Sequence, residues 1–69
     1  MPYTSNADLP ESVSGVLPEH ARNTFRDMFN YALIQHPDEE RAIRVAWAAV
    51  SRRYVRGPDG YWTERPDWA

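Results

Sequence analysis

The sequence predicts one small, mainly helical domain of the α+β class, with three helices, the first of them short, and a small antiparallel sheet of two or three strands. Two observations indicate the helices: a Leu-Pro-Glu unit occurs twice, and the apolar residues that follow the second unit recur at spacings of three and four. Two short aromatic-bearing stretches on either side of a Gly-Pro-Asp-Gly turn indicate the sheet. We expect residues 1–69 to form a single domain.

The composition limits the classes of protein to which this chain can belong. With 69 residues, 42% apolar residues and a formal net charge of −2, it is too short for a multidomain enzyme with its own cofactor-binding fold. It has no cysteine, which excludes disulfides, a thiolate nucleophile and a thiolate zinc site. There is no run of roughly 18 apolar residues and no secretory signal at the start. We therefore expect a cytoplasmic protein that does not insert into a membrane.

The first two helices are predicted from their starts. Leu9-Pro10-Glu11 and Leu17-Pro18-Glu19 both place a proline at the first helical position and a glutamate in the first turn, near the positive end of the helix dipole. The first helix can cover only about residues 10–15, because Pro18 disfavours helical backbone before it. The second is predicted over about residues 18–35. Its apolar stripe consists of Ala21, Phe25, Met28, Phe29, Ala32 and Leu33.

The third helix is predicted over about residues 38–54, as an antiparallel neighbour of the second, because only a short link around Pro37 separates them. Its apolar residues cover more than half of its circumference, so we expect it to be the central helix, packed on two sides. We expect its alanines, at 42, 46 and 49, to allow close approach of another helix, and Trp47 and Tyr54 to fill the more open flank.

A hairpin is predicted after the third helix. Residues 54–56 and 61–63 flank residues 57–60, a pattern typical of a type I turn followed by a left-handed glycine. Because an isolated two-stranded hairpin is marginal in water, its aromatic residues should fold back on the helices. Tyr3 could add a third short strand. We expect the tail after residue 63 to be frayed, with Trp68 available to dock.

No residue set in the sequence predicts a catalytic or metal site. His20 and His36, although carboxylates lie near both, are sixteen residues apart on one helix, roughly 24 Å, so they cannot share an ion within a monomer. There is no glycine-rich phosphate loop, no nucleophile elbow and no Ser/His/Asp set. Glu39 and Glu40 are interpreted as solvated partners of a helix dipole. We expect no enzymatic activity, no metal and no cofactor.

Charge is distributed unevenly along the chain. Residues 1–40 carry seven acids and two arginines, whereas residues 41–58 carry five arginines and no acid. These arginines could form a basic patch that binds phosphate or an acidic loop of a partner protein, or they could complement the helix dipole and pair with acids elsewhere. The candidate binding residues are Arg41, Arg44, Arg52, Arg53 and Arg56.

Aromatic residues beside these arginines allow a second hypothesis. Tyr54, Tyr61, Trp62 and Trp68 are candidates for a platform on which bases of a single-stranded nucleic acid stack. The alternative use of such residues is packing of the core and the hairpin. A chain of net charge −2 also needs its arginines on one side to bind a polyanion well.

Several segments, spread in order over nearly the whole chain, resemble the ChaB family. They are Met1-Pro2-Tyr3, Asp8-Leu9-Pro10-Glu11-Ser12-Val13, Leu17-Pro18 with His20-Ala21, Phe29-Asn30, and Val45-Ala46-Trp47-Ala48-Ala49-Val50 followed by Tyr54, Gly57 and Trp62. The connection around Pro37 departs from the family pattern, since family members can carry a longer, highly charged linker there.

The resemblance implies a compact helical domain with a small antiparallel sheet and, as function, regulation of a sodium or calcium/proton antiporter in the bacterial inner membrane. We accordingly expect a small, monomeric, non-enzymatic binding protein, whose partner is a protein such as the cytoplasmic face of that antiporter. The alternative, also suggested by viral members of the family, is a nucleic-acid-associated protein that uses the arginine and aromatic surface.

Overall fold

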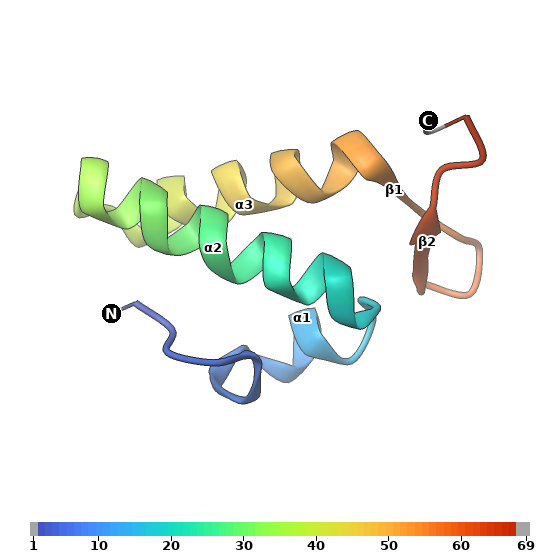
Figure 1. The fold of residues 1–69 in the computed structure, drawn as a ribbon, viewed down its shortest axis with the longest axis horizontal. Helices are drawn as coiled ribbons and strands as arrows, with labels where there is room; N and C mark the ends of the chain where they lie inside the picture. Colours follow the sequence, from blue (N-terminus) through green and yellow to red (C-terminus); the bar gives the residue numbers. More distant parts are fainter. Residues whose placement is uncertain (1, 68–69) are drawn as a thin grey trace.

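The computed structural model describes residues 2–67 and has the predicted mainly helical architecture with a small sheet (Figure 1). Two long antiparallel helices lie side by side, the N-terminal segment runs along one of them, and the hairpin lies at one end of the molecule. The elements, in chain order, are the 3-10 turn η1 (Asn6–Asp8), α1 (Glu11–Ser14), α2 (Glu19–Gln35), α3 (Glu39–Arg53), β1 (Tyr54–Arg56) and β2 (Trp62–Glu64).

All three α-helices begin one residue later than predicted, because the residue expected to be the first helical one is the N-cap. The backbone of Pro10 and Pro18 is extended, and the Pro18 carbonyl accepts the first hydrogen bond of α2, from the Arg22 N–H at 3.0 Å. Asp38 caps α3 with its side chain, whose Oδ1 accepts from the backbone N–H of Glu40 and Arg41 at 3.1 and 3.3 Å. The side chain of Asp38 thus satisfies two donors that have no partner within the helix.

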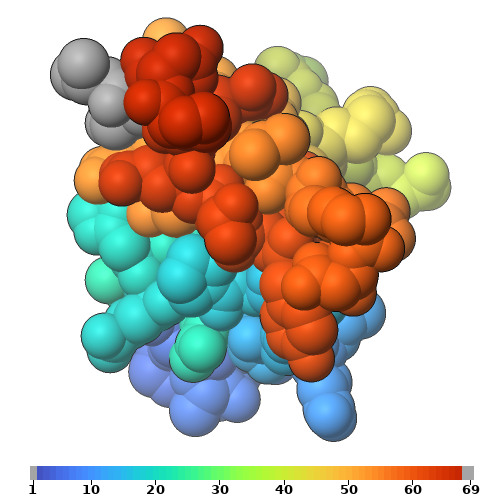
Figure 2. Space-filling model, turned by 90° about the vertical axis from the view of Figure 1, so that its right-hand side faces the viewer, coloured from blue at the N-terminus to red at the C-terminus, as the bar shows by residue number. Residues whose placement is uncertain are grey.

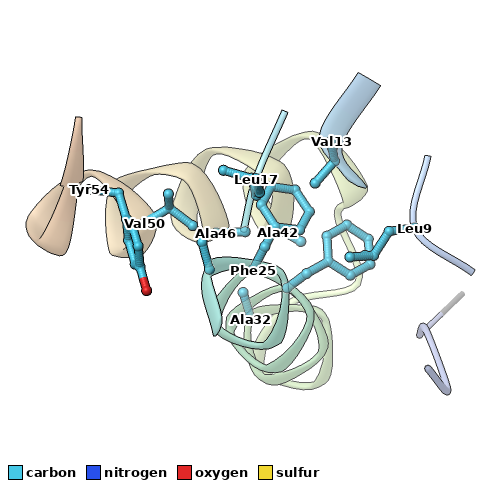
Figure 3. Packing of buried hydrophobic residues seen from close by; sticks show 11 residues of the cluster. Leu9, Val13, Leu17, Phe25, Ala32, Ala42, Ala46, Val50 and Tyr54 are labelled. Atoms are coloured by element: carbon cyan, nitrogen blue, oxygen red, sulfur yellow. The ribbon is translucent and has the colours of Figure 1, made fainter. Parts of the chain in front are cut away.

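The core lies between α2, α3 and the segment that contains α1 (Figure 3). Ala42 and Ala46 are fully buried, and their small side chains leave room for the aromatic rings of α2, Phe25 and Phe29, which are also buried. Ala49, also expected at the helix contact, is only partly buried, and Val50 continues the buried stripe instead. The buried apolar residues are Leu9, Val13, Leu17, Ala21, Phe25, Phe29, Ala32, Ala42, Ala46, Val50 and Tyr54.

The prediction that the third helix is the central one is wrong, because α2 occupies that place. One side of α2 packs along α3, and the N-terminal segment lies against another side of α2 (Figure 1). The Asn6 side chain donates to Oδ1 of Asn23 on α2 at 2.6 Å. The apolar residues of α3 are not all buried, since Ile43 is 41% exposed, and its fully buried residues form one narrow stripe.

Tyr3 does not form a third strand, and the sheet within residues 2–67 has two strands. The Tyr3 backbone instead binds the Asn30 side chain: its N–H donates to Oδ1 at 2.8 Å, and its carbonyl accepts from Nδ2 at 2.7 Å. Its ring packs on Phe29 with a centroid separation of 4.7 Å. An amide side chain has a donor and an acceptor and therefore occupies both backbone groups that a neighbouring strand would need.

The N-terminal turn η1 is stabilised by the carboxylate of Asp8. This carboxylate accepts a hydrogen bond from the Thr4 hydroxyl at 2.5 Å and one from the Ser5 backbone N–H at 3.3 Å. The Thr4 bond is the main reason that the pKa of Asp8 lies below its ordinary value. Because both donors come from the residues just before η1, Asp8 closes the turn locally.

The hairpin has the predicted turn, and its second strand begins one residue later than predicted. Gly60 has a positive φ of 89°, and its N–H donates to the Gly57 carbonyl at 3.0 Å. The strands are antiparallel, with Arg56 opposite Trp62. The hairpin also folds back as expected: the Trp62 ring stacks on Trp47 of α3 with a centroid separation of 5.3 Å, and the Trp62 N–H donates to the Val16 carbonyl, in the loop before α2, at 2.9 Å. The expectation of a frayed tail is wrong at Glu64 and Arg65, because Glu64 belongs to β2 and the Arg65 N–H donates to the Arg53 carbonyl at 2.8 Å. The expectation that Trp68 docks lies outside the described residues.

Candidate functional site

Two hollows share Trp62 as a lining residue and lie where the hairpin meets the helices. Figure 2 shows this end of the molecule. The first, which we name the tryptophan hollow, has a volume of about 340 Å³. It is lined by Ser12, Val16, Trp47, Arg56, Gly60 and Trp62. The second, which we name the His20 hollow, has a volume of about 490 Å³. It is lined by Pro18, His20, Arg53, Tyr54, Trp62, Thr63 and Glu64.

The indole rings of Trp47 and Trp62 form the apolar wall of the tryptophan hollow. They stack with a centroid separation of 5.3 Å and an interplanar angle of 27°. The ring of Phe25 meets Trp47 edge-on at 5.1 Å from the other side. The wall is therefore supported by the buried core, while both indoles remain partly exposed to the solvent.

Arg56 brings positive charge to the tryptophan hollow. It lies directly opposite Trp62 in the hairpin, so that both side chains are on the same face of the two-stranded sheet. Its side chain is exposed and makes no hydrogen bond or ion pair with another residue in the part of the chain that the structure describes. The guanidinium of Arg56 is thus available to a ligand in the hollow.

Arg53, in contrast, is occupied by contacts within the protein. Its Nε donates to Oε2 of Glu64 at 2.6 Å, and its guanidinium lies 5.8 Å from the centre of the Tyr54 ring. Its Nη1 lies 3.0 Å from Nε2 of His20. Because a guanidinium nitrogen can only donate, Nε2 of His20 is the acceptor in this contact. Arg53 therefore connects the start of α2, the end of α3 and β2.

The other three candidate arginines, Arg41, Arg44 and Arg52, lie along the solvent-facing side of α3. Their spacing places them on one face of the helix, over a length of about 16 Å. All three are exposed, and their side chains form no ion pair among the described residues. We name them the α3 arginine stripe. The five arginines of the sequence analysis thus differ in their surroundings: three lie in this stripe, Arg53 is bonded within the protein, and Arg56 lines the tryptophan hollow.

The aromatic residues proposed as a stacking platform are also divided. Tyr54 is buried in the core, and Trp62 is partly buried against Trp47. Tyr61 is 56% exposed, and Trp68 lies outside the described residues. Packing of the core and the hairpin is therefore the principal use of Tyr54 and Trp62.

The sequence analysis missed two features of this end of the molecule. His20 was considered with His36 as a metal ligand and rejected, but nothing in the sequence indicated its contact with Arg53, 33 residues away. Ser12, which lines the tryptophan hollow, was named only within a family segment and not as a candidate binding residue. No pattern near either residue indicates these neighbours, because His20 and Ser12 meet them only when the helices and the hairpin pack together.

The described residues contain neither a metal-binding cluster nor a membrane-spanning helix. In residues 2–67, no group of three or more His, Asp or Glu side chains is arranged to hold a metal ion. Among the helices of the same residues, none combines the length and the apolar character needed to cross a membrane.

Comparison with known proteins places the chain in a family. The sequence model of the ChaB family matches residues 9–65. This chain belongs to the ChaB family. ChaB relatives from Escherichia coli K12 and Shigella flexneri are 43% identical to it over an alignment that covers 94% of this chain and 99% of each relative. Both are named "Putative cation transport regulator ChaB".

The ChaB fold has also been solved. An NMR solution structure of ChaB superimposes on this chain with a TM-score of 0.85 at 42% sequence identity, over 93% of this chain and 99% of the other. The similarity confirms the resemblance and the mainly helical fold class predicted from the sequence.

Proposed function

We propose that this protein is a regulator of cation transport that acts without catalysis, as a cytoplasmic monomer, by binding a protein partner. The observation that carries the proposal is the similarity, over nearly the full length, to relatives whose name describes a regulator of cation transport. The distribution of side chains supports it: the large apolar residues are mostly used in the core, whereas four of the five candidate arginines are available to a partner.

The partner that we propose is the cytoplasmic face of a sodium or calcium/proton antiporter. A regulator can change transport only if it binds one conformation of the transporter more tightly than another. The α3 arginine stripe offers three positive charges that no acid of the described chain neutralises, and it would complement an acidic loop of the transporter. Such charge pairs increase the rate of association and determine the orientation of the complex.

The test is retention of the purified protein on membrane vesicles that contain the antiporter, compared with otherwise identical vesicles that lack it. We expect selective retention, reduced several-fold by Arg44→Gln and by Arg52→Gln. Ala7→Glu is the matched control, because it changes the net charge by the same amount at an exposed position of the N-terminal segment. Equal retention on both kinds of vesicle would overturn the proposal.

The alternative, association with nucleic acid, has less support. Of the four aromatic residues suggested for stacking, Tyr54 is buried and Trp62 packs on Trp47, and Arg53 is held by Glu64. Phosphate contacts would make binding fall steeply with increasing salt. Retardation of DNA or RNA by the protein at about 50 mM salt, lost at higher salt, would favour this alternative.

A further inference from the structure

The tryptophan hollow has features of a binding site that the packing of the protein does not itself require. Its walls come from α1, α3 and both strands of the hairpin, so it forms only when these elements have come together. Its volume of about 340 Å³ lies at the lower end of the range found for ligand pockets. It can accommodate one large apolar side chain and the groups next to it.

The position of the hollow's walls is held by backbone contacts. The hydrogen bond from the Trp62 N–H to the Val16 carbonyl joins β2 to the loop before α2. At Gly60, no atom outside the two neighbouring residues lies within 4 Å of the position that a Cβ would occupy. The backbone at this part of the rim is therefore accessible. A site that exists before the ligand arrives loses less conformational entropy on binding.

The charge of the hollow selects an anionic ligand. Within residues 2–67, Arg56 is the only charged residue that lines the hollow, and no carboxylate lines it. An arginine guanidinium binds carboxylates in a bidentate manner, and the Ser12 hydroxyl, which also lines the hollow, can donate a further hydrogen bond. The indoles of Trp47 and Trp62 offer a surface for an apolar or aromatic group beside that carboxylate.

One guanidinium beside two indoles fits a peptide better than a nucleic acid. A nucleic-acid strand needs several cations along its backbone, and among the residues that the structure describes no second arginine lines the hollow. A peptide can place one carboxylate next to one large apolar side chain within the size of the hollow. We propose that the tryptophan hollow binds an acidic segment of the protein partner, with a Phe, Leu or similar side chain on the indoles and a neighbouring Asp or Glu on Arg56.

The choice of a protein as the source of the ligand rests on the proposed function, but the binding itself can be tested without a transporter. We would titrate the full-length protein with an end-capped peptide of sequence Gly-Glu-Phe-Glu-Gly and follow it by two-dimensional proton–nitrogen NMR. We expect shifts of the indole N–H signals of Trp47 and Trp62 and of the Arg56 backbone amide. Gly-Lys-Phe-Lys-Gly, which lacks the side-chain carboxylates, and Gly-Glu-Ala-Glu-Gly, which lacks the aromatic ring, should each bind at least tenfold more weakly.

Variants of the protein provide the matched controls. Arg56→Gln should weaken binding of the acidic peptide about tenfold, whereas Ala7→Glu, which changes the net charge by the same amount at an exposed position of the N-terminal segment, should leave it unchanged. Both positions are exposed, so both variants should retain the fold.

Three results would overturn the inference. They are no indole shift at millimolar peptide, equal binding of the lysine peptide, or shifts confined to the α3 arginine stripe. Equivalent indole shifts with a short oligothymidylate would assign the hollow to nucleic acid instead. If the vesicle test failed and this titration succeeded, the antiporter would be rejected as the partner, whereas the peptide site in the tryptophan hollow would stand.

Discussion

Arg53 and Arg52 are neighbours in the sequence, but their side chains have different surroundings. Arg53 binds Glu64 and His20, whereas Arg52 is exposed and forms no ion pair within residues 2–67. The difference arises because consecutive residues of a helix point about 100° apart, so only one of the two faces α2 and the hairpin. The two positions therefore provide a direct comparison of a bonded and an unbonded arginine.

We expect Arg53→Gln to lower the free energy of unfolding by about 0.5–1 kcal/mol, a small cost because the Arg53 side chain is 36% exposed. Arg53→Lys should recover only part of it, because an ammonium group lacks the planar fork that contacts both partners. Arg52→Gln should have almost no effect. Urea denaturation followed by circular dichroism measures all three. An equal loss in Arg52→Gln would contradict the assigned contacts.

The ends of the helices are decided by residues next to them in the sequence. Pro10, Pro18 and Asp38 each precede a helix, and each occupies the N-cap in the structure. Asp38 alone among them caps with its side chain, whereas the two prolines contribute only their carbonyls and lack the N–H that would need a partner. These starts could be predicted to within one residue because the physical cause is local.

We expect Asp38→Ala to destabilise the protein by about 1 kcal/mol, because the backbone N–H groups of Glu40 and Arg41 lose their acceptor. Asp38→Asn keeps a side-chain oxygen at the cap and should recover most of the loss. Thermal unfolding followed by circular dichroism is the measurement. If Asp38→Ala melted at the temperature of the unmodified protein, α3 would not depend on this cap.

The helix α2 is central because its side chains make contacts on two sides of the helix. Phe25 and Phe29 pack in the core, and Asn23 and Asn30 bind the N-terminal segment. The sequence analysis assigned the central place to the third helix, since it counted apolar residues around the circumference. That count could not distinguish Ile43, which remains 41% exposed, from Ala42, which is fully buried.

Stability of the whole molecule depends on a small aromatic core. Phe25 is 1% exposed and contacts both Phe29 and Trp47, whose ring centroids lie 6.4 and 5.1 Å away. We expect Phe25→Ala to cost about 3–5 kcal/mol, enough to unfold most of a domain of this size. Trp47→Ala should cost less, because part of the Trp47 ring already faces solvent in the tryptophan hollow.

Circular dichroism measures both variants, through the loss of the native spectrum and of the melting transition. An equal or greater loss in Trp47→Ala would place the centre of the core at the indole pair. An unchanged melting temperature in Phe25→Ala would mean that α2 does not pack through this face.

The helices, the turn with its left-handed glycine and the family resemblance could all be predicted from the order of residues, because prolines, caps, helical spacing and turn chemistry act over a few positions. The contacts of Arg53 with His20 and of Tyr3 with Asn30 could not, since they join residues 33 and 27 positions apart. Those pairs, and the hollow between Trp47 and Trp62, form when α2 packs on α3 and the hairpin closes over their end. Which arginines remain free to meet a partner was therefore decided by packing, because exposure depends on neighbours that the local sequence does not specify.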